Sequence, residues 1–565
     1  MTPDELLNGL DAEQRVAAEA LLGPVCILAG AGTGKTRAIT HRIAYGVATG
    51  AYAPSRVMAL TFTNRAAAEL RGRLRALGAG GVQARTFHAA ALAQLNHFWP
   101  LVAGGRMPEL APGKARILGH AAQVLKLKLD TATLRDAASE IEFRKVSGLS
   151  IDAYARAGRP TPGNLTAEQL ADLMAAYETL KDERRLIDFE DVLLVTAGMI
   201  ESEPQVAMQV REQYRFFVVD EYQDVSPLQQ QLLELWLGDR RDVCVVGDAS
   251  QTIYSFAGAS SGFLLGFERR WEDAIVVRLE QNYRSAPPVV AAANELMRGR
   301  QGSLVLHAAH ADEPAPTPSV VQHPSDAAEA TAVAASVAAS IAAGSAPESI
   351  AVLYRVNVQA AALEQALTQA GVPYRIHGAK RFFDQPEVKQ AVLALRAASV
   401  TVSGEPLFKS VSDVLRSLGW TQSPPEAAGA VRDRWESLNA LMTLADQAPA
   451  GTTFRRFTDE LLERQAGQHE PTVRAVTLAT LHSAKGLEWD EVHIVGLSEG
   501  LVPISYATTF EQVDEERRLL YVGITRARRR LRLSWSETGT GRAGARQPSR
   551  FLAELGSRIE RAARA

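Results

Sequence analysis

The sequence predicts an α/β protein in which two parallel sheets follow one another, each in a domain interrupted by a mostly helical insertion. Short apolar runs alternate with long helical patterns, as in chains that build parallel sheets. These runs fall into two sets, whereas residues 98–185 and 393–471 carry helical patterns without them. With 565 residues, the chain has room for about three to five domains.

Each expected strand of the first set ends in small, polar or acidic residues, and ligands collect at such carboxyl ends in doubly wound folds. We expect the proline-containing stretch 307–325 to be a loop or linker, and the tail after residue 536 to add little core. The expected strands are Val25–Ala29, Val57–Phe62, Phe216–Val219 and Val243–Val246 in the first set, and Ala351–Tyr354, Tyr374–His377, Val476–Thr480, Val492–Leu497 and Leu531–Ser534 in the second.

The composition is that of an ordinary globular protein. The chain has 61 Lys and Arg against 64 Asp and Glu, a formal net charge of −3, and 46% of its residues are hydrophobic. This excludes a collagen-like, disulfide-stapled or wholly disordered chain. The two cysteines, Cys26 and Cys244, lie in apolar runs and are expected to be buried strand residues. Because neither a signal-peptide layout nor a membrane-length apolar stretch occurs, we expect a cytoplasmic protein without a membrane partner.

The strongest local signal is the string AGAGTGKT, which follows an expected strand and opens an expected helix. Glycines let successive backbone N–H groups converge on phosphate oxygens, and the helix N-terminus favours negative charge. Lys35 is expected to contact the β- and γ-phosphates of ATP, and Thr36 to hold Mg²⁺. The nucleotide-binding residues expected here are Ala29, Gly30, Ala31, Gly32, Thr33, Gly34, Lys35 and Thr36.

Two acidic residues and two arginines complete the expected hydrolytic site. The apolar strand in FFVVDEYQD delivers Asp220 to the Mg²⁺ and Glu221 to the attacking water. Arg284 in LEQNYRS and Arg526 in GITRAR are expected to stabilise the negative charge that develops on the transferred phosphate. Both arginines lie in the second half of the chain, so a site that uses both is expected between the two sheet domains.

Aromatic, hydroxyl and basic residues at strand ends are of the types that suit contacts to a single strand of nucleic acid, because bases stack on aromatic faces and phosphates attract cations and hydroxyls. An aromatic residue taken alone is more often part of the core. The candidates are Thr61, Phe62, Thr63 and Asn64; Thr86, Phe87 and His88; Tyr254 and Phe256; and Arg355, Lys380, Arg381, Phe382 and His482.

Eleven motif strings occur in the order found in superfamily 1A DNA helicases of the UvrD/PcrA/Rep type, which the chain resembles over nearly its whole length. They include LTFTNRAAAEL (60–70), VVDEYQD (218–224), VVGDASQTIYSFAGA (245–259), TLHSAKGLEWDEV (480–492) and EERRLLYVGITRAR (515–528). The resemblance implies an ATP- and Mg²⁺-dependent helicase that moves 3′ to 5′ on single-stranded DNA and acts at single/double-strand junctions. It further implies a role in DNA repair, with repair proteins as partners.

The same resemblance implies further roles and domain boundaries. Gln14 resembles the residue that recognises adenine, and Arg37 and Tyr283 resemble the pair that stacks on either side of the base. Gln251 resembles the residue that senses the γ-phosphate, and Glu488 resembles the residue that contacts the ribose. Asp248 belongs to the segment of Gln251. The implied domains are a first RecA-like domain (1–97 and 186–280) with a helical insertion (98–185), and a second RecA-like domain (281–392 and 472–565) with a shortened insertion (393–471).

The shortened insertion leaves two other interpretations open. The chain could be a translocase that strips proteins from single strands and unwinds duplex poorly alone, or the motor subunit of a helicase–nuclease complex. No nuclease constellation follows the last motif. A scaffold with an inactive ATPase fold is disfavoured by the intact Lys35, Asp220, Glu221, Arg284 and Arg526.

Overall fold

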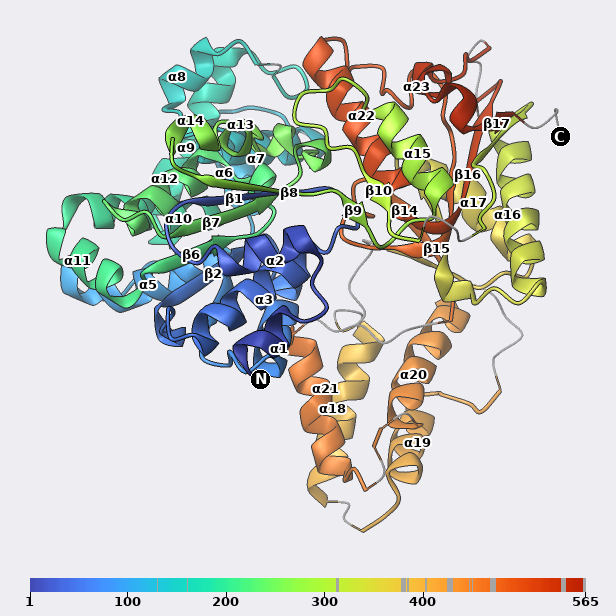
Figure 1. Ribbon diagram of the computed structural model, residues 1–565, viewed down its shortest axis with the longest axis horizontal. Coiled ribbons are helices and arrows are strands. Elements are labelled where there is room, and N and C mark those ends of the chain that lie inside the picture. The colour runs from blue at the N-terminus through green and yellow to red at the C-terminus, as the bar shows by residue number, and fades with distance from the viewer. Residues whose placement is uncertain are drawn as a thin grey trace. The chain divides into compact units, whose positions relative to one another are not determined.

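The chain divides into two compact units, and each is described by itself. The computed structural model describes residues 1–129, 131–159, 161–310, 314–377, 383, 386–401, 404–423, 430–446, 448–449, 451–467, 474–539 and 545–561. The first unit comprises Met1–Arg284, Met297–Ala311 and Thr509–Tyr521; the second comprises Ser285–Leu296, Asp312–Thr508 and Val522–Ala565. Each unit contains one large parallel sheet flanked by helices, which confirms the expected α/β class (Figure 1). Among the described residues, no helix combines the length and apolar character needed to cross a bilayer.

The sheet of the first unit has six parallel strands, and the four strands predicted for it are confirmed. Their apolar runs are buried on both faces, as in sheets covered by helices on each side. Across the sheet the strands are β3 (Gln83–Thr86), β2 (Val57–Thr61), β6 (Phe216–Val219), β7 (Val243–Gly247), β1 (Val25–Ala29) and β8 (Ile275–Leu279). Because all are parallel, the segments after β1, β2, β6 and β7 emerge at one edge of the sheet.

Helices cover both faces of this sheet and form two separate cores (Figure 1). One face packs against α1 (Pro3–Leu7), α2 (Ala12–Glu19), α3 (Lys35–Ala48) and α4 (Asn64–Ala76). The other packs against α5 (Phe87–Val102), α10 (Phe189–Ser202), α11 (Pro204–Gln213) and α12 (Pro227–Leu237), around the fully buried Trp236. The Trp236 indole N–H donates to Gln94 Oε1 at 2.8 Å, so this large core residue leaves no buried donor unpaired. Two short helices follow β7: α13 (Gly262–Leu265) and α14 (Phe267–Arg270).

Both cysteines are buried in the neighbouring strands β1 and β7, as predicted, where Val25 pairs with Cys244 and Cys26 with Val245. Burial raises the pKa of the Cys26 thiol to about 12, and it also raises that of Cys244. Both side chains therefore behave as small apolar core residues.

Residues 98–185 are mostly helical, as predicted. The segment is closed by a two-stranded pairing of β4 (Glu109–Leu110) with β5 (Leu186–Ile187), and the helices between them share their own apolar core. These helices are α6 (Lys114–Val124), α7 (Thr131–Val146), α8 (Ile151–Arg156) and α9 (Ala167–Glu183).

A buried ion network ties this helical segment to α10. Asp188, which caps α10, accepts hydrogen bonds from Lys145 Nζ at 2.7 Å, Lys181 Nζ at 3.2 Å and the Tyr177 hydroxyl at 2.9 Å. Lys145 and Lys181 also pair with Asp191. Although burial opposes ionisation, the two ammonium groups hold the pKa of Asp188 well below its usual range.

The sheet of the second unit has seven strands, all parallel, and the five predicted strands are present with shifts of up to four residues at their ends. In spatial order they are β13 (Tyr374–Ile376), β14 (Val476–Thr480), β12 (Ile350–Tyr354), β15 (Trp489–Ile494), β16 (Ala527–Ser536), β11 (Ser319–His323) and β17 (Glu560–Arg561). Helices α16 (Asp326–Ala342) and α17 (Val358–Gln369) pack on β12 and β14. Helices α15 (Pro287–Leu296) and α23 (Arg550–Glu554) contact each other, and α15 also contacts β16.

Residues 393–471 are also mostly helical where the structure describes them, as predicted. Four helices pack together in this part of the chain: α18 (Pro386–Thr401), α19 (Leu407–Ser417), α20 (Ala430–Asp446) and α21 (Phe454–Gly467). Their apolar core is a cluster of its own that includes Leu395, Val411, Leu415, Trp420 and Leu441.

Two sequence-based expectations are wrong. The stretch 307–325 is not simply a linker, because β10 (His307–Ala308) pairs with β9 (Gln281–Asn282), and β11 lies inside the second sheet between β16 and β17. The tail after residue 536 does contribute core, since Phe551 and Leu555 are fully buried. Strands of two to five residues among prolines, and four apolar residues in a polar tail, give too weak a periodicity to be recognised.

We expect Asp188→Asn to destabilise the first unit by about 3 kcal/mol, because two buried ammonium groups lose a shared counter-charge while the helix cap is kept. Thermal and urea unfolding followed by circular dichroism will measure this. The matched control is Glu69→Gln, which removes an exposed pair with Arg73 and should change stability by no more than about 0.5 kcal/mol. Equal effects of the two substitutions would contradict a stabilising role for the network.

Candidate functional site

The phosphate-binding loop connects β1 to α3 and depends on glycine at two points. Gly32 and Gly34 have positive φ values of 72° and 80°. A Cβ on Gly32 would lie 2.6 Å from Asn282 Nδ2, and one on Gly34 would lie 2.7 Å from Gln14 Nε2. Gly34 is the N-cap of the 14-residue α3 and provides no side-chain cap, so the first turn of the helix presents its backbone N–H groups to a ligand.

Lys35 is the first residue of α3, and its ammonium group is buried. Nζ lies 3.5 Å from Glu221 Oε1, an ion-pair distance, and no group within the described residues accepts a hydrogen bond from it. An ammonium group out of contact with water and without an acceptor is costly. Phosphate oxygens would accept hydrogen bonds from this ammonium group, so the loop fits a nucleoside triphosphate.

Asp220 and Glu221 follow β6 at the same edge of the sheet as the loop. Burial, aided by the charge of Glu221 and opposed by that of Lys35, raises the pKa of Asp220 to about 7. A desolvated carboxylate beside a phosphate-binding loop and Thr36 fits a Mg²⁺ ion bound together with the phosphates. Glu221 adopts a left-handed conformation with φ of 54°, which is unfavourable for a residue with a side chain and is a kind of strain that clusters at functional sites.

A chain of buried hydrogen bonds connects Glu221 to Gln251. Gln223 Nε2 donates to Glu221 Oε2 at 2.5 Å, and Gln223 Oε1 accepts from the Asp248 backbone N–H at 3.0 Å. Gln251 Nε2 then donates to Asp248 Oδ2 at 2.7 Å. Sequence reasoning did not assign a role to Gln223, although it stands two residues after Glu221 in the acidic motif. It fixes the orientation of the Glu221 carboxylate and links it to the segment of Gln251.

The predicted base-binding residues surround the other side of the loop. Gln14 Nε2 donates to the Thr33 carbonyl at 2.9 Å, and Arg37 Nη2 donates to the Gly9 carbonyl at 2.9 Å. The hydroxyl of the exposed Tyr283 donates to Asp11 Oδ2 at 2.6 Å. Asp11 also caps the helix of Gln14, an anchoring role that sequence reasoning missed.

The segment after β8 returns across the loop and brings Arg284 with it. The Tyr283 backbone N–H donates to the Gly32 carbonyl at 2.9 Å, and Asn282 Nδ2 donates to the Ala31 carbonyl at 2.6 Å. Arg284, which chain order grouped with the second sheet domain, therefore lies in the first unit, where its Cβ is 2.7 Å from the position of a Cβ on Gly32. Sequence reasoning assigned no role to Asn282, although the residue lies in the LEQNYRS string that contains Arg284.

Arg526 and Glu488 belong to the second unit. The Arg526 side chain is fully buried, with Nε donating to the Val522 carbonyl at 2.9 Å and Nη1 to the Leu487 carbonyl at 3.2 Å. Glu488 is exposed and pairs with Arg528 at 2.5 Å. The sequence segments that carry these two residues are thus adjacent within the second unit.

Of the predicted DNA-contact residues at the end of β2, one is buried and the other three are exposed. Phe62, Thr63 and Asn64 are exposed at the start of α4, and Thr63 also caps this helix by accepting from the Ala66 N–H at 3.1 Å. Thr61 is buried, and its hydroxyl has no hydrogen-bond partner among the described residues. The exposed residues provide one aromatic ring, one hydroxyl and one amide at the carboxyl edge of the sheet.

The next predicted cluster needs one correction. Phe87 is a core residue, 2% exposed and stacked on Trp236 at 5.9 Å, because it occupies the first inward-facing position of α5. Thr86 caps this helix through Ala89. His88 instead contacts Phe189 with ring centroids 5.5 Å apart; Phe189 is 59% exposed and was missed by sequence reasoning.

Tyr254 and Phe256 form an edge-to-face pair with centroids 6.1 Å apart, and Phe256 is exposed. In the second unit, Arg355 follows β12 and His482 follows β14. Burial and the charge of Arg355 lower the pKa of His482 to about 4, so His482 is neutral at pH 7. Lys380, like Arg381 and Phe382, lies outside the described residues.

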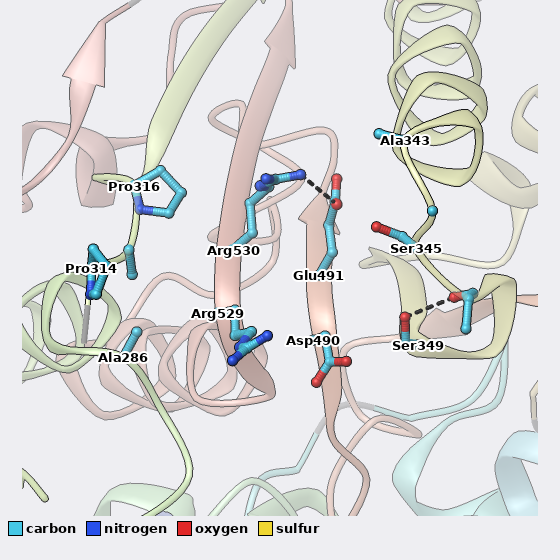
Figure 2. Close-up of a pocket in the computed structure, with 13 residues that line it drawn as sticks. Ala286, Pro314, Pro316, Ala343, Ser345, Ser349, Asp490, Glu491, Arg529 and Arg530 are labelled. Carbon is cyan, nitrogen blue, oxygen red and sulfur yellow. Dashed lines mark hydrogen bonds and ion pairs between the residues drawn. The ribbon is translucent and has the colours of Figure 1, made fainter. Parts of the chain in front are cut away.

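A cavity of about 660 Å³ in the second unit contains none of the predicted site residues. It lies beside the first residues of β15 and β16, and Figure 2 shows Arg529, Asp490 and the ion pair of Arg530 with Glu491, which is 3.1 Å long. Its other walls are short side chains around Pro314 and Ser345. The cavity thus lies at the amino-terminal edge of the sheet, whereas the predicted residues lie at the opposite, carboxyl edge.

Two family models match the chain. The UvrD/REP helicase N-terminal domain matches residues 10–272, and the UvrD-like helicase C-terminal domain matches residues 277–423 and 408–538. The chain is 50% identical over 576 residues to ATP-dependent DNA helicase UvrD2 of Mycobacterium tuberculosis, covering 97% of this chain and 82% of the relative. It is 31% identical to DNA helicase II of Escherichia coli (97% and 88% covered) and 28% identical to ATP-dependent DNA helicase PcrA of Bacillus subtilis (98% and 86% covered).

Acidification should destabilise the protein partly through His88. Burial, with the charge of Lys114, lowers the pKa of His88 to about 4, whereas in the unfolded chain the imidazole takes up a proton below about pH 6.5. Between pH 7 and 5 the unfolded state is therefore favoured, and the wild type should lose about 1–2 kcal/mol more than His88→Gln. Urea unfolding at both pH values will measure this. The control is His97→Gln, an exposed site on the same helix, and equal pH dependence in all three proteins would refute the assignment.

Proposed function

Because the chain belongs to the UvrD/Rep helicase family, we propose that it is an ATP-dependent DNA helicase that moves 3′ to 5′ on single-stranded DNA. Hydrolysis would be coupled between its two RecA-like domains (1–97 with 186–280, and 281–392 with 472–565) to strand separation at single/double-strand junctions. The observation that carries this proposal is the buried Lys35 ammonium, which lies 3.5 Å from Glu221 and lacks a hydrogen-bond acceptor among the described residues. We further propose that the protein acts in DNA repair, with repair proteins as partners.

In this proposal the loop and its surroundings bind ATP. Backbone N–H groups of the loop and Lys35 bind the β- and γ-phosphates, Gln14 reads the adenine, and Arg37 and Tyr283 hold the base between them. Glu488 contacts the ribose. The exposure of Tyr283 and its anchoring through Asp11 support a stacking role, because the hydroxyl is held in place while 43% of the residue stays exposed.

Hydrolysis is assigned to the acidic pair and the arginines. Thr36 and Asp220 would hold Mg²⁺, which neutralises phosphate charge when bound. Glu221 accepts the proton of the attacking water, and the hydrogen-bond chain through Gln223 and Asp248 supports its orientation relative to Gln251. Arg284 and Arg526 stabilise the charge that develops on the transferred phosphate.

Single-stranded DNA is proposed to contact residues at the carboxyl edges of both sheets. Exposed aromatic rings suit stacking without sequence preference, and arginine and hydroxyl groups suit phosphates. The proposed contacts are Thr61, Phe62, Thr63, Asn64, Thr86, His88, Tyr254, Phe256, Arg355, Lys380 and His482.

A translocase that displaces proteins and unwinds poorly alone is the second candidate, and the alignment with a relative favours it. The similarity to the Escherichia coli DNA helicase II extends over 646 positions, more than the 565 residues of this chain, so that relative contains residues with no counterpart here. We propose that they include part of the insertion that corresponds to 393–471, and that the remaining helices give weaker duplex engagement.

The function is tested by ATP hydrolysis without nucleic acid and with single-stranded DNA, duplex DNA or RNA, combined with unwinding of 3′- and 5′-tailed duplexes. We expect single-stranded DNA to stimulate hydrolysis at least about tenfold, with unwinding only from the 3′ tail. Lys35→Ala is the control and should abolish hydrolysis but retain DNA binding. Unwinding from the 5′ tail would overturn the polarity, and stimulated hydrolysis with no unwinding would favour the translocase.

Glu221→Gln should bind ATP and DNA with affinities within about threefold of the wild type, but reduce kcat at least about 100-fold, because the amide cannot accept the proton of the water. Single-turnover hydrolysis and fluorescent-nucleotide binding will measure the two effects separately. Gln231→Glu, at an exposed position on α12, serves as a control for a Gln/Glu exchange and should leave kcat unchanged. Near-normal kcat in Glu221→Gln would assign the base to another residue.

A further inference from the structure

A turn after β15 in the second unit presents one aromatic side chain to solvent. Tyr506 is 68% exposed, although the residues that precede it are anchored: Val502 is fully buried and Ile504 is 8% exposed. The turn is closed by backbone hydrogen bonds from the Ser505 N–H to the Gly500 carbonyl at 3.1 Å and from the Ala507 N–H to the Ile504 carbonyl at 3.0 Å. Tyr506 is therefore displayed on a fixed turn.

The same side chain contacts a predicted DNA-binding arginine. Arg355 Nη2 donates to the Tyr506 hydroxyl at 3.5 Å, and the Arg355 backbone N–H is held by Gln359 Oε1 at 2.9 Å. β14, β12 and β15 are neighbours in the sheet, so the segments that follow them share one edge. Arg355, His482 and Tyr506 each follow one of these three strands, and the charge of Arg355 is felt by His482. An aromatic face, a guanidinium and an imidazole thus gather at one place in the second unit.

We propose that Tyr506 is a base-stacking residue for single-stranded DNA, with Arg355 binding an adjacent phosphate. The arrangement provides what sequence-independent recognition needs: a ring face for any base and a cation for the backbone beside it. The hydroxyl contact to Arg355 limits the freedom of both side chains, which lowers the entropy lost on binding. The inference rests on the proposed function, since it names a contact for the same substrate.

The test is equilibrium binding of a fluorescently labelled oligothymidine to the full chain, with wild type, Tyr506→Ala and Tyr506→Phe compared. Stacking on one aromatic residue is worth about 1–3 kcal/mol, so Tyr506→Ala should weaken binding by about 5- to 150-fold. Tyr506→Phe keeps the ring and should stay within about threefold of wild type. Phe408→Ala removes a comparably exposed ring on α19 in the same unit and should leave affinity unchanged.

A second oligothymidine with abasic sites separates stacking from other causes. Without bases, the difference between wild type and Tyr506→Ala should disappear. A difference that persists on the abasic strand, or Tyr506→Phe binding as weakly as Tyr506→Ala, would overturn the stacking role. If wild type binds DNA and Tyr506→Ala binds it equally well, the inference fails while the proposed function stands. If wild type binds no DNA, the proposed function fails with it.

Discussion

The buried ammonium group of Lys35 is the constraint on which the rest of the site depends. A cation held away from water without a hydrogen-bond acceptor costs several kcal/mol, and the nearby Glu221 offsets only part of this at 3.5 Å. Burial also raises the pKa values of Asp220 and Asp248. The site therefore favours an anion beside the Lys35 ammonium group and a cation beside these carboxylates. Phosphate oxygens would satisfy the ammonium and a divalent cation the carboxylates, which favours joint binding of the two.

Parallel topology brings these groups together, and local backbone geometry sets their orientation. The loop, the acidic pair and Asp248 each follow a different strand of one sheet, so a site assembled from distant segments requires only that the strands be parallel and adjacent. Within the site, Glu221, Gly32 and Gly34 adopt positive φ values, outside the range of regular helices and strands. Such departures persist when surrounding contacts hold them, here through Gln223, Asn282 and Gln14.

The sequence predicted the parts of this fold whose signals are local. Continuous apolar runs identified β1, β2, β6 and β7, because strands buried on both faces contain few polar residues. The edge strand β3 (QART) and β11 (SVVQH) lack such runs, because polar residues make up much of each. Within the site, the loop and the acidic pair can be recognised from their spacing in the sequence. The supporting roles of Asp11, Gln223 and Asn282 cannot, because they depend on which atom each amide or carboxylate reaches in the folded chain. The exposed rings of Phe189 and Tyr506 were missed because exposure of an aromatic side chain is set by packing. The burial of Phe87 was missed for the same reason.

The burial of both thiols has a practical consequence. Thiolates, not thiols, react with maleimides, and Cys26 and Cys244 combine inaccessibility with raised pKa values. The native chain is thus a ready background for site-specific dye attachment: one cysteine introduced at a surface position of each sheet domain would give a donor–acceptor pair without removing either natural cysteine. Single-molecule energy transfer can then follow motion between the labelled positions in an otherwise unaltered protein.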